Sequence, residues 1–193
     1  SLAGTSPIEL GSIVAKEALA RSGVEGKQVG NVVFGHVINT EPRDMYLSRA
    51  ASIAAGVPEK APAMNVNRLC GSGLQAIVSA AQSLMLGDAT MALAGGSESM
   101  SRSPYIVPAI RWGQKMGDTG ATDMMLGALN CPFGTGHMGV TAENVAAEYD
   151  ITREAQDAFA LQSQERALNA LKEGYFKSQI VPVEVKVKRN TAF

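Results

Sequence analysis

Cys70 is the residue of this sequence whose type and surroundings best suit covalent chemistry. It stands between a predicted strand, residues 63–69, and a predicted helix, residues 71–86, and Gly71 and Gly73 flank Ser72 just after it. The unpaired amides and the dipole of a first helical turn favour a thiolate and would face a developing oxyanion. The glycines leave a carbonyl substrate room to approach the sulfur. A nucleophilic cysteine is one interpretation, and a buried structural cysteine in a tight turn is the other.

The elements around Cys70 form a predicted βαβ unit. Residues 63–69 and 89–94 have strand patterns, and the helix between them is rich in Ala, Leu and Ile. Residues 32–38 are apolar on both faces, as expected of a strand buried in a parallel sheet, so the predicted fold class is α/β. Because sites of such sheets lie at the carboxyl ends of the strands, Cys70 and the turn at 95–99 should share one rim.

Further elements and a domain boundary follow from the same patterns. Helices are predicted over residues 7–21, 46–55, 141–149 and 152–172, and a strand over 180–187. Ser6, Pro7 and Glu9 give the first helix an N-terminal capping signal, and Gly23 ends it. The composition changes after Pro104: residues 104–140 are dominated by Ser, Pro, Gly, Met and Asp and have no sustained strand pattern. This change predicts one domain over residues 1–100 and another over 101–193.

Composition narrows the classes of function. The 193 residues carry a formal net charge of −1 with both signs interleaved, which speaks against a nucleic-acid partner. Every apolar run is interrupted before the roughly 18 residues of a membrane span, which predicts a soluble protein without a membrane partner. Two cysteines cannot build the disulfide framework of small secreted domains, so a cytoplasmic location is expected.

Three motifs, in order along the chain, resemble the thiolase family. The first surrounds Cys70 and resembles the thiolase signature around the cysteine that becomes acylated. The second and third look like downstream thiolase segments. They read Val-Asn-Arg-Leu-Cys-Gly-Ser-Gly-Leu-Gln-Ala-Ile over 66–77, Gly-Gly-Ser-Glu-Ser-Met-Ser over 95–101, and Gly-His-Met-Gly-Val-Thr-Ala-Glu-Asn over 136–144. The likeness covers essentially the whole chain and is closest to bacterial β-ketothiolases and acetyl-CoA acetyltransferases.

The resemblance implies an acyltransferase with no bound cofactor that uses coenzyme A and acyl-CoA as substrates. Cys70 would attack the keto carbon of a 3-oxoacyl-CoA, acetyl-CoA would leave, and coenzyme A would take the acyl group, with condensation of two acyl-CoA molecules as the reverse reaction. His137 and Met138 would line the substrate pocket, although His137 could instead only satisfy backbone groups in a Gly-rich loop. The family is homodimeric or homotetrameric, and we expect the same here.

The resemblance also implies a fold larger than this chain. Thiolases have two similar α/β halves in a layered αβαβα fold, with a loop domain inserted in the first half. We therefore expect residues 1–100 to be the front of an incomplete N-terminal half and 101–193 to be part of the inserted loop domain. The activating histidine and the second catalytic cysteine belong to the other half, so this stretch alone should be almost inactive.

Several alternatives stay open from the sequence. Another condensing enzyme of the thiolase superfamily, a non-catalytic thiolase-like lipid-binding protein and, less well supported, a cysteine hydrolase would each accommodate Cys70. The sequence does not indicate acyl chain length, the physiological direction or the residues that bind the coenzyme A phosphates. His36 is interpreted as packing or bonding locally, and Cys131 as a thiol without a role.

Overall fold

The computed structural model describes residues 2–185, which fall into two compact units. The first comprises residues 2–125 and 181–185, and the second comprises residues 126–180. The residues of each unit contact one another more than they contact the other unit, and such units are not the same as family domains. The boundary between family domains near residue 101 stays a prediction.

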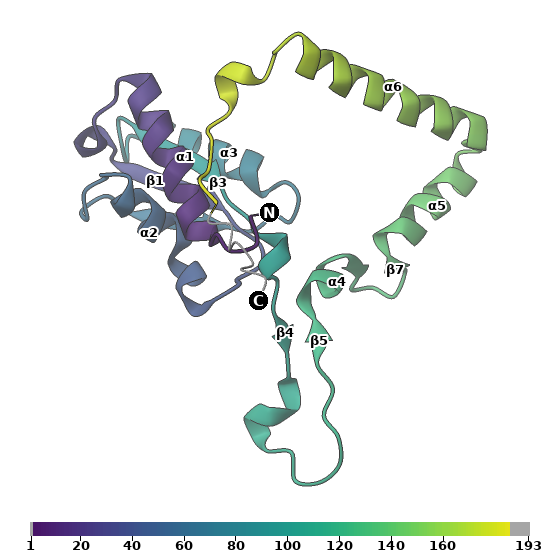
Figure 1. The fold of residues 1–193 in the computed structure, drawn as a ribbon. Coiled ribbons are helices and arrows are strands. Elements are labelled where there is room, and N and C mark those ends of the chain that lie inside the picture. The colour runs from purple at the N-terminus through teal and green to yellow at the C-terminus, as the bar shows by residue number, and fades with distance from the viewer. Residues whose placement is uncertain (1, 186–193) are drawn as a thin grey trace, which may run out of the picture. The chain divides into compact units, whose positions relative to one another are not determined.

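A parallel sheet forms the centre of the first unit. Its strands are β1 (Asn31–Gly35), β2 (Ala63–Val66) and β3 (Ala92–Gly96), in the order β2-β1-β3. Strands β1 and β3 are labelled in Figure 1. In the central strand, Val33 pairs with Met64 on one side and with Ala94 on the other. All three strands run in the same direction, so the carboxyl ends of β1, β2 and β3 meet at one rim, as the sequence predicts.

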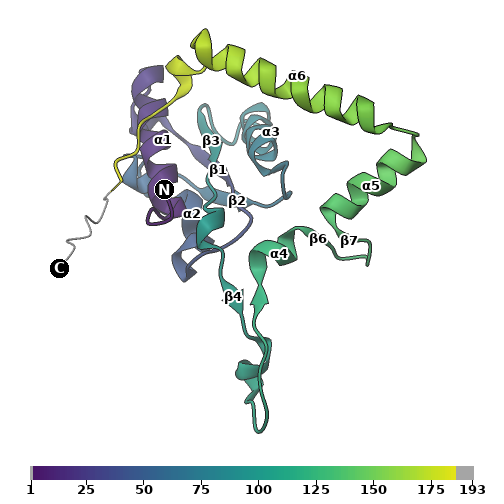
Figure 2. The same cartoon turned by 45° about the vertical axis from the view of Figure 1, so that its right-hand side comes forward.

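Helices cover both faces of this sheet. Helices α1 (Pro7–Ser22) and α2 (Leu47–Ala54) pack together on one face, and α3 (Ser72–Met85) packs on the other (Figure 2). Because successive side chains of a strand point to opposite faces, Val32 and Phe34 enter the core beneath α1 and α2, whereas Val33 packs beneath α3. The predicted α/β class is confirmed.

Helix α1 begins and ends where its sequence signals predict. The Ser6 hydroxyl accepts a hydrogen bond from the Glu9 N–H over 3.2 Å, and Pro7 is the first helical residue. At the other end Gly23 has a φ of 69°, and its N–H donates to the Ala20 and Leu19 carbonyls. The predicted helix over residues 7–21 is therefore confirmed to within one residue.

The remaining elements of the first unit are short. Helix α2 starts at Leu47 because residues 42–46 form a separate 3-10 turn. Other 3-10 turns are Gly26–Gln28, Met100–Arg102 and Pro108–Trp112, and the two-residue strands β4 (Tyr105–Ile106) and β5 (Thr122–Asp123) pair antiparallel. Of the strand predicted over 180–187, residues 180–185 are irregular and 186–187 lie outside the described residues. Alternating side chains do not make a strand unless a neighbour supplies the hydrogen-bonded ladder.

The second unit is a hairpin followed by two helices. Its elements are β6 (Asn130–Cys131), β7 (Gly136–His137), α5 (Met138–Glu148), α6 (Arg153–Lys172) and a 3-10 turn at Lys177–Gln179, and α4 (Met124–Ala128) spans the division between the units. Helix α6 agrees with its prediction to within one residue, and the Thr152 hydroxyl caps it. Helix α5 begins three residues before its predicted start at 141. No helix within residues 2–185 combines the length and apolarity needed to cross a membrane.

Adding one methyl group to Gly35 is expected to destabilise the first unit. A Cβ there would lie 2.7 Å from the Ser72 carbonyl carbon and 2.9 Å from the Gly73 nitrogen, and backbone atoms cannot give way as a flexible side chain can. Gly35→Ala should lower the free energy of unfolding by about 1–3 kcal/mol in urea denaturation of the full-length protein. Gly120→Ala is the matched control, because a Cβ there meets nothing within 4 Å. Equal stability of the two variants would contradict this account.

Candidate functional site

Cys70 lies on a short loop between the end of β2 at Val66 and the start of α3 at Ser72. This loop is at the carboxyl end of the parallel sheet, where sites of such sheets are found. The Cys70 side chain is exposed in this chain. A buried structural thiol, the alternative that the sequence leaves open, is therefore not what the structure contains.

The buried Ser72 hydroxyl braces the turn before Cys70. It donates a hydrogen bond to the Leu69 carbonyl over 2.6 Å and accepts one from the Arg68 N–H over 2.9 Å. Leu69 has a φ of 49°, a left-handed conformation that is uncommon for residues other than glycine. Its N–H donates to the Asn67 side chain over 3.0 Å. Side-chain hydrogen bonds thus hold the backbone of the turn in a conformation that the chain alone would seldom adopt.

The two glycines beside Ser72 leave open space in this chain. A Cβ on Gly73 would meet no atom within 4 Å, and the atoms nearest to one on Gly71 belong to Arg68, the first at 3.4 Å. The room that the sequence predicts beside Cys70 is present at Gly73. The close approach of helix to strand depends instead on Gly35, which the sequence analysis does not single out.

Asn65 joins β2 to the loop that follows β1. Its Oδ1 accepts from the Ser48 N–H over 2.9 Å, and its Nδ2 donates to the carbonyls of Asp44 and Met45 over 3.1 and 3.2 Å. Asp44 is fully buried, and its Oδ2 accepts from the N–H and the hydroxyl of Thr40 over 2.7 and 2.8 Å. The strand that leads into the Cys70 loop is therefore tied by hydrogen bonds to the loop after β1.

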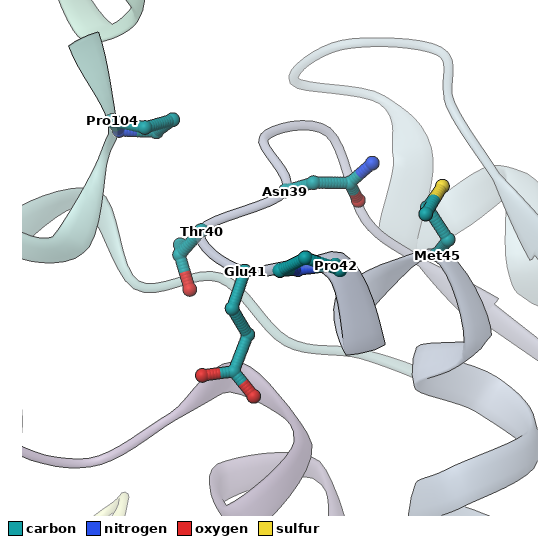
Figure 3. A pocket seen from close by; sticks show the side chains of 6 residues that line it. All are labelled: Asn39, Thr40, Glu41, Pro42, Met45 and Pro104. Atoms are coloured by element: carbon teal, nitrogen blue, oxygen red, sulfur yellow. The ribbon is translucent and has the colours of Figure 1, made fainter.

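A hollow of about 290 Å³, open to solvent, lies on the loop after β1 and does not include Cys70. Figure 3 shows the side chains that line it, which are Asn39, Thr40, Glu41, Pro42, Met45 and Pro104. The Arg102 guanidinium donates to the Glu41 carboxylate over 3.1 Å at this place. Three of the six lining residues are proline or methionine, and the carboxylate among them, that of Glu41, is the one paired with Arg102.

His36 has partners that the sequence interpretation misses. The sequence predicts local packing, but the ring Nδ1 lies 2.9 Å from the carbonyl oxygen of Ser97, which is 61 residues away, and 3.3 Å from the Glu98 carboxylate. Both partners follow β3, as His36 follows β1. The signal that could have revealed the contact is that both segments directly follow strands predicted to end at one rim.

His137 and Met138 form the junction of β7 and α5 in the second unit. His137 is the N-cap residue of α5, and its Nδ1 accepts a hydrogen bond from the Gly139 N–H over 3.0 Å. Because Nδ1 accepts, the proton of the neutral ring is on Nε2, and the exposed side chain can offer a donor there. The Met138 side chain is 41% exposed, and its N–H donates to the Leu129 carbonyl over 2.8 Å.

Cys131 occupies the hairpin that precedes His137, where Asn130 pairs with His137 and Cys131 with Gly136. A hydrogen bond from the Thr135 side chain, together with bonds from the backbone amides of Phe133 and Thr135, lowers the pKa of the Cys131 thiol. No group of three or more His, Cys, Asp or Glu side chains that could hold a metal ion occurs in the described part of the chain. Cys70 belongs to the first unit and His137 to the second.

Comparison with known proteins decides the family. The sequence model of the thiolase N-terminal domain matches residues 1–193. The chain belongs to the thiolase family. The resemblance drawn from the three motifs is confirmed.

Individual thiolases match the chain over almost its whole length. It is 63% identical over 189 residues to the Beta-ketothiolase BktB of Cupriavidus necator, covering 98% of this chain and 48% of that protein. The structures of Bacillus anthracis acetyl-CoA acetyltransferase and of human mitochondrial 3-ketoacyl-CoA thiolase in complex with CoA both match with a TM-score of 0.92, at 41% and 38% identity. These matches cover 98% and 96% of this chain and 48% and 47% of those chains. This thiolase chain thus spans about half the length of its relatives.

Removing the Ser72 hydroxyl is expected to loosen the Cys70 turn of this thiolase. Ser72→Ala deletes both hydrogen bonds and leaves the Arg68 N–H without its acceptor, so the free energy of unfolding should fall by about 1–3 kcal/mol. Urea denaturation of the full-length protein measures the change. Ser101→Ala, at an exposed position of the same unit, serves as the control and should stay within about 0.5 kcal/mol of the wild type. A Ser72 variant as stable as this control would contradict the bracing role.

Proposed function

We propose that this protein transfers acyl groups to and from coenzyme A through a thioester on Cys70. The observation that carries the proposal is an exposed cysteine on a braced turn between a parallel strand and a helix, in a chain of the thiolase family. The reaction is thiolytic cleavage of a 3-oxoacyl-CoA or, in reverse, condensation of two acyl-CoA molecules. The names of the related β-ketothiolase and acetyl-CoA acetyltransferase support this reaction type.

The chemistry divides into two transfers. The Cys70 sulfur attacks the keto carbon of the 3-oxoacyl-CoA, the bond between that carbon and the α-carbon breaks, and the α-carbon takes a proton and leaves as acetyl-CoA. The thiol of a second coenzyme A then attacks the thioester, and the Cys70 sulfur leaves. By the family resemblance, the histidine that activates Cys70 and the cysteine that protonates the α-carbon belong to the C-terminal half of the protein.

The start of α3 supplies the electrostatic setting for these transfers. The first turn of this 14-residue helix directs backbone N–H groups toward the loop that carries Cys70. We propose the Cys70 N–H as one donor to the thioester oxyanion, where a well-placed donor is worth about 10²–10³ in rate. The bracing of the turn by Ser72 matters because such donors stabilise a transition state only when they are held in place beforehand.

We also propose that His137 and Met138 position the acyl-CoA substrate. The supporting observation is that Nδ1 of His137 accepts a hydrogen bond from the Gly139 N–H. The Nε2–H group is then available as a donor to substrate. Nε2–H would donate to a polar atom of the acyl-pantetheine moiety. The half-exposed Met138 offers a flexible thioether that can adapt to different acyl chains.

We also propose a partner, a location and an oligomeric state for the enzyme. Acyl-CoA is the expected partner, and the CoA bound in the human thiolase structure supports it. A cytoplasmic location fits the two free cysteines, and a homodimer or homotetramer is expected from the family resemblance. A different condensing enzyme, a lipid-binding protein and a cysteine hydrolase are the alternatives that experiment must separate.

The proposal predicts coenzyme A-dependent cleavage of acetoacetyl-CoA that requires Cys70. Full-length protein given acetoacetyl-CoA and coenzyme A should form two acetyl-CoA for each substrate consumed, and chromatography of the acyl-CoA pool measures both. Cys70→Ser should lower the rate by at least about 10³, as loss of a nucleophile does elsewhere. Cys131→Ser makes the same chemical change outside the proposed site and should leave the rate close to that of the wild type. Release of free acid would indicate a hydrolase, and binding without turnover would indicate a lipid-binding protein.

The proposed role of His137 in positioning substrate can be separated from its role as the N-cap of α5. Asn is a favoured N-cap residue, so His137→Asn should keep the stability of α5 while removing Nε2–H. We expect this variant to unfold as the wild type does and to raise KM for acyl-CoA several-fold, since one hydrogen bond is worth about 0.5–1.5 kcal/mol. His137→Ala should lose both properties. Unchanged steady-state constants in the Asn variant would mean that His137 only caps the helix.

A further inference from the structure

The buried His36 and the partly buried Glu98 are in contact between the ends of β1 and β3. The His36 side chain is 2% exposed, and its Nδ1 lies 2.9 Å from the Ser97 carbonyl oxygen and 3.3 Å from Glu98 Oε1. The main chain makes two further ties at this rim. The His36 N–H donates to the Val66 carbonyl over 3.1 Å, and the Ser97 N–H donates to the Gly35 carbonyl over 3.1 Å.

The partners of Nδ1 determine which nitrogen carries the proton. A carbonyl oxygen can only accept, so Nδ1 of His36 must be the donor, and the adjacent carboxylate oxygen accepts from the same N–H. Nε2 is the other ring nitrogen, and it is buried without a hydrogen-bond partner among the described residues. His36 is therefore oriented through Nδ1, whereas His137 uses Nδ1 as an acceptor.

Glu98 holds the backbone that follows β1. Its Oε2 accepts from the Val37 N–H over 2.8 Å, and its Oε1 accepts from the Ile38 N–H over 3.1 Å. Both carboxylate oxygens are thus used by adjacent amides, and charge-assisted bonds of this kind are stronger than neutral ones. The Glu98 carboxylate, two residues after the end of β3, thus fixes the main chain where it leaves β1.

These contacts lead to the Cys70 loop through β2. Val66, which accepts from the His36 N–H, is the last residue of β2 and stands four positions before Cys70. The segment after β1 is also tied to β2 by Asn65, which donates to the carbonyls of Asp44 and Met45. A shift of the ends of β1 and β3 would therefore be passed to β2, the strand that leads into the Cys70 loop.

We propose that His36 and Glu98 are positioning residues of the acyl-transfer site, and that they act through Nδ1–H of His36 and the two amide contacts of Glu98. The proposal rests on the proposed function of Cys70. Neither residue needs to touch substrate. Their contribution is to keep the three strand ends in register so that the Cys70 turn faces the substrate in one conformation, and misplacement of about 1 Å can lower a rate by about 10².

Two substitutions of His36 separate its two nitrogens. The amide nitrogen of Asn occupies nearly the position of Nδ1, so His36→Asn keeps the donor to Ser97 and deletes Nε2. Gln reaches the position of Nε2 and lacks a donor at Nδ1. We expect His36→Asn to retain the rate of Cys70 acylation within about threefold and His36→Gln to lower it about tenfold or more. The same order is expected for the rate at which iodoacetamide alkylates Cys70 in the folded protein.

A matched pair of glutamate variants tests the other partner. Glu98→Gln replaces one accepting oxygen by an NH₂ group that would oppose a backbone N–H, and we expect the acylation rate to fall about tenfold. Glu9→Gln makes the same change at an exposed site and should have no effect. Each rate is referred to the folded protein, counted by circular dichroism, so that poor folding is not taken for a lost positioning effect.

The outcomes distinguish this inference from the proposed function. Rescue by Gln rather than Asn would assign the role to Nε2 and overturn the inference, as would equal rates in all variants. Lower stability with unchanged acylation and alkylation rates would reduce the pair to a structural role. If the wild type is not acylated but Cys70 alkylation still follows the expected order, the proposed function fails while the positioning role stands.

Discussion

The close approach of α3 to the end of β1 is the constraint on which the rest of the Cys70 region depends. Gly35 has no side chain, so the Ser72 and Gly73 backbone can lie where a Cβ would otherwise be. At the same place the Ser72 hydroxyl accepts from the Arg68 N–H and donates to the Leu69 carbonyl, which braces the turn before Cys70. The loop with Cys70 therefore leads into a helix whose first residues lie against the end of β1.

The two faces of the sheet are packed in different ways. Phe34 and Val32 meet α1 and α2 through large apolar side chains, whereas α3 meets Val33 through the small residues Ala76 and Ala80. Small residues let the axis of α3 lie close to the sheet. The missing side chain of Gly35 permits the same close approach at the start of α3. On α3 the apolar side chains Leu74, Ile77 and Met85 are 69%, 56% and 86% exposed, as expected of a surface that a further layer covers in the αβαβα fold of the family.

The sequence predicts the elements better than it predicts their contacts. Capping residues and periodicity locate α1, α3 and α6 to within a residue, because these signals are local. The strand pattern at 180–187 fails over residues 180–185, because a strand needs a partner that the pattern does not specify. Cys70 is identifiable from its position after a strand and before a helix.

The residues that support the Cys70 loop could not be predicted from the sequence, because their contacts are long-range. Gly35, His36 and Glu98 act on segments that are distant in the chain, and nothing next to them in the sequence names their partners. His36 in a strand pattern predicts packing, and only the fold shows that its Nδ1 faces the end of β3. Ser72 is visible as part of the motif, but the sequence does not indicate that its hydroxyl bonds to Arg68 and Leu69 and braces the left-handed conformation of Leu69.

In the proposed reaction the sulfur of Cys70 carries the acyl group. Intact-mass analysis of the full-length protein after rapid quench from acetyl-CoA or acetoacetyl-CoA, followed by peptide mapping, measures this directly. We expect an acetyl adduct of about 42 Da that maps to Cys70 and is absent from the Cys70→Ser variant. Active wild-type protein without an adduct, or an adduct of equal amount in the variant, would contradict it.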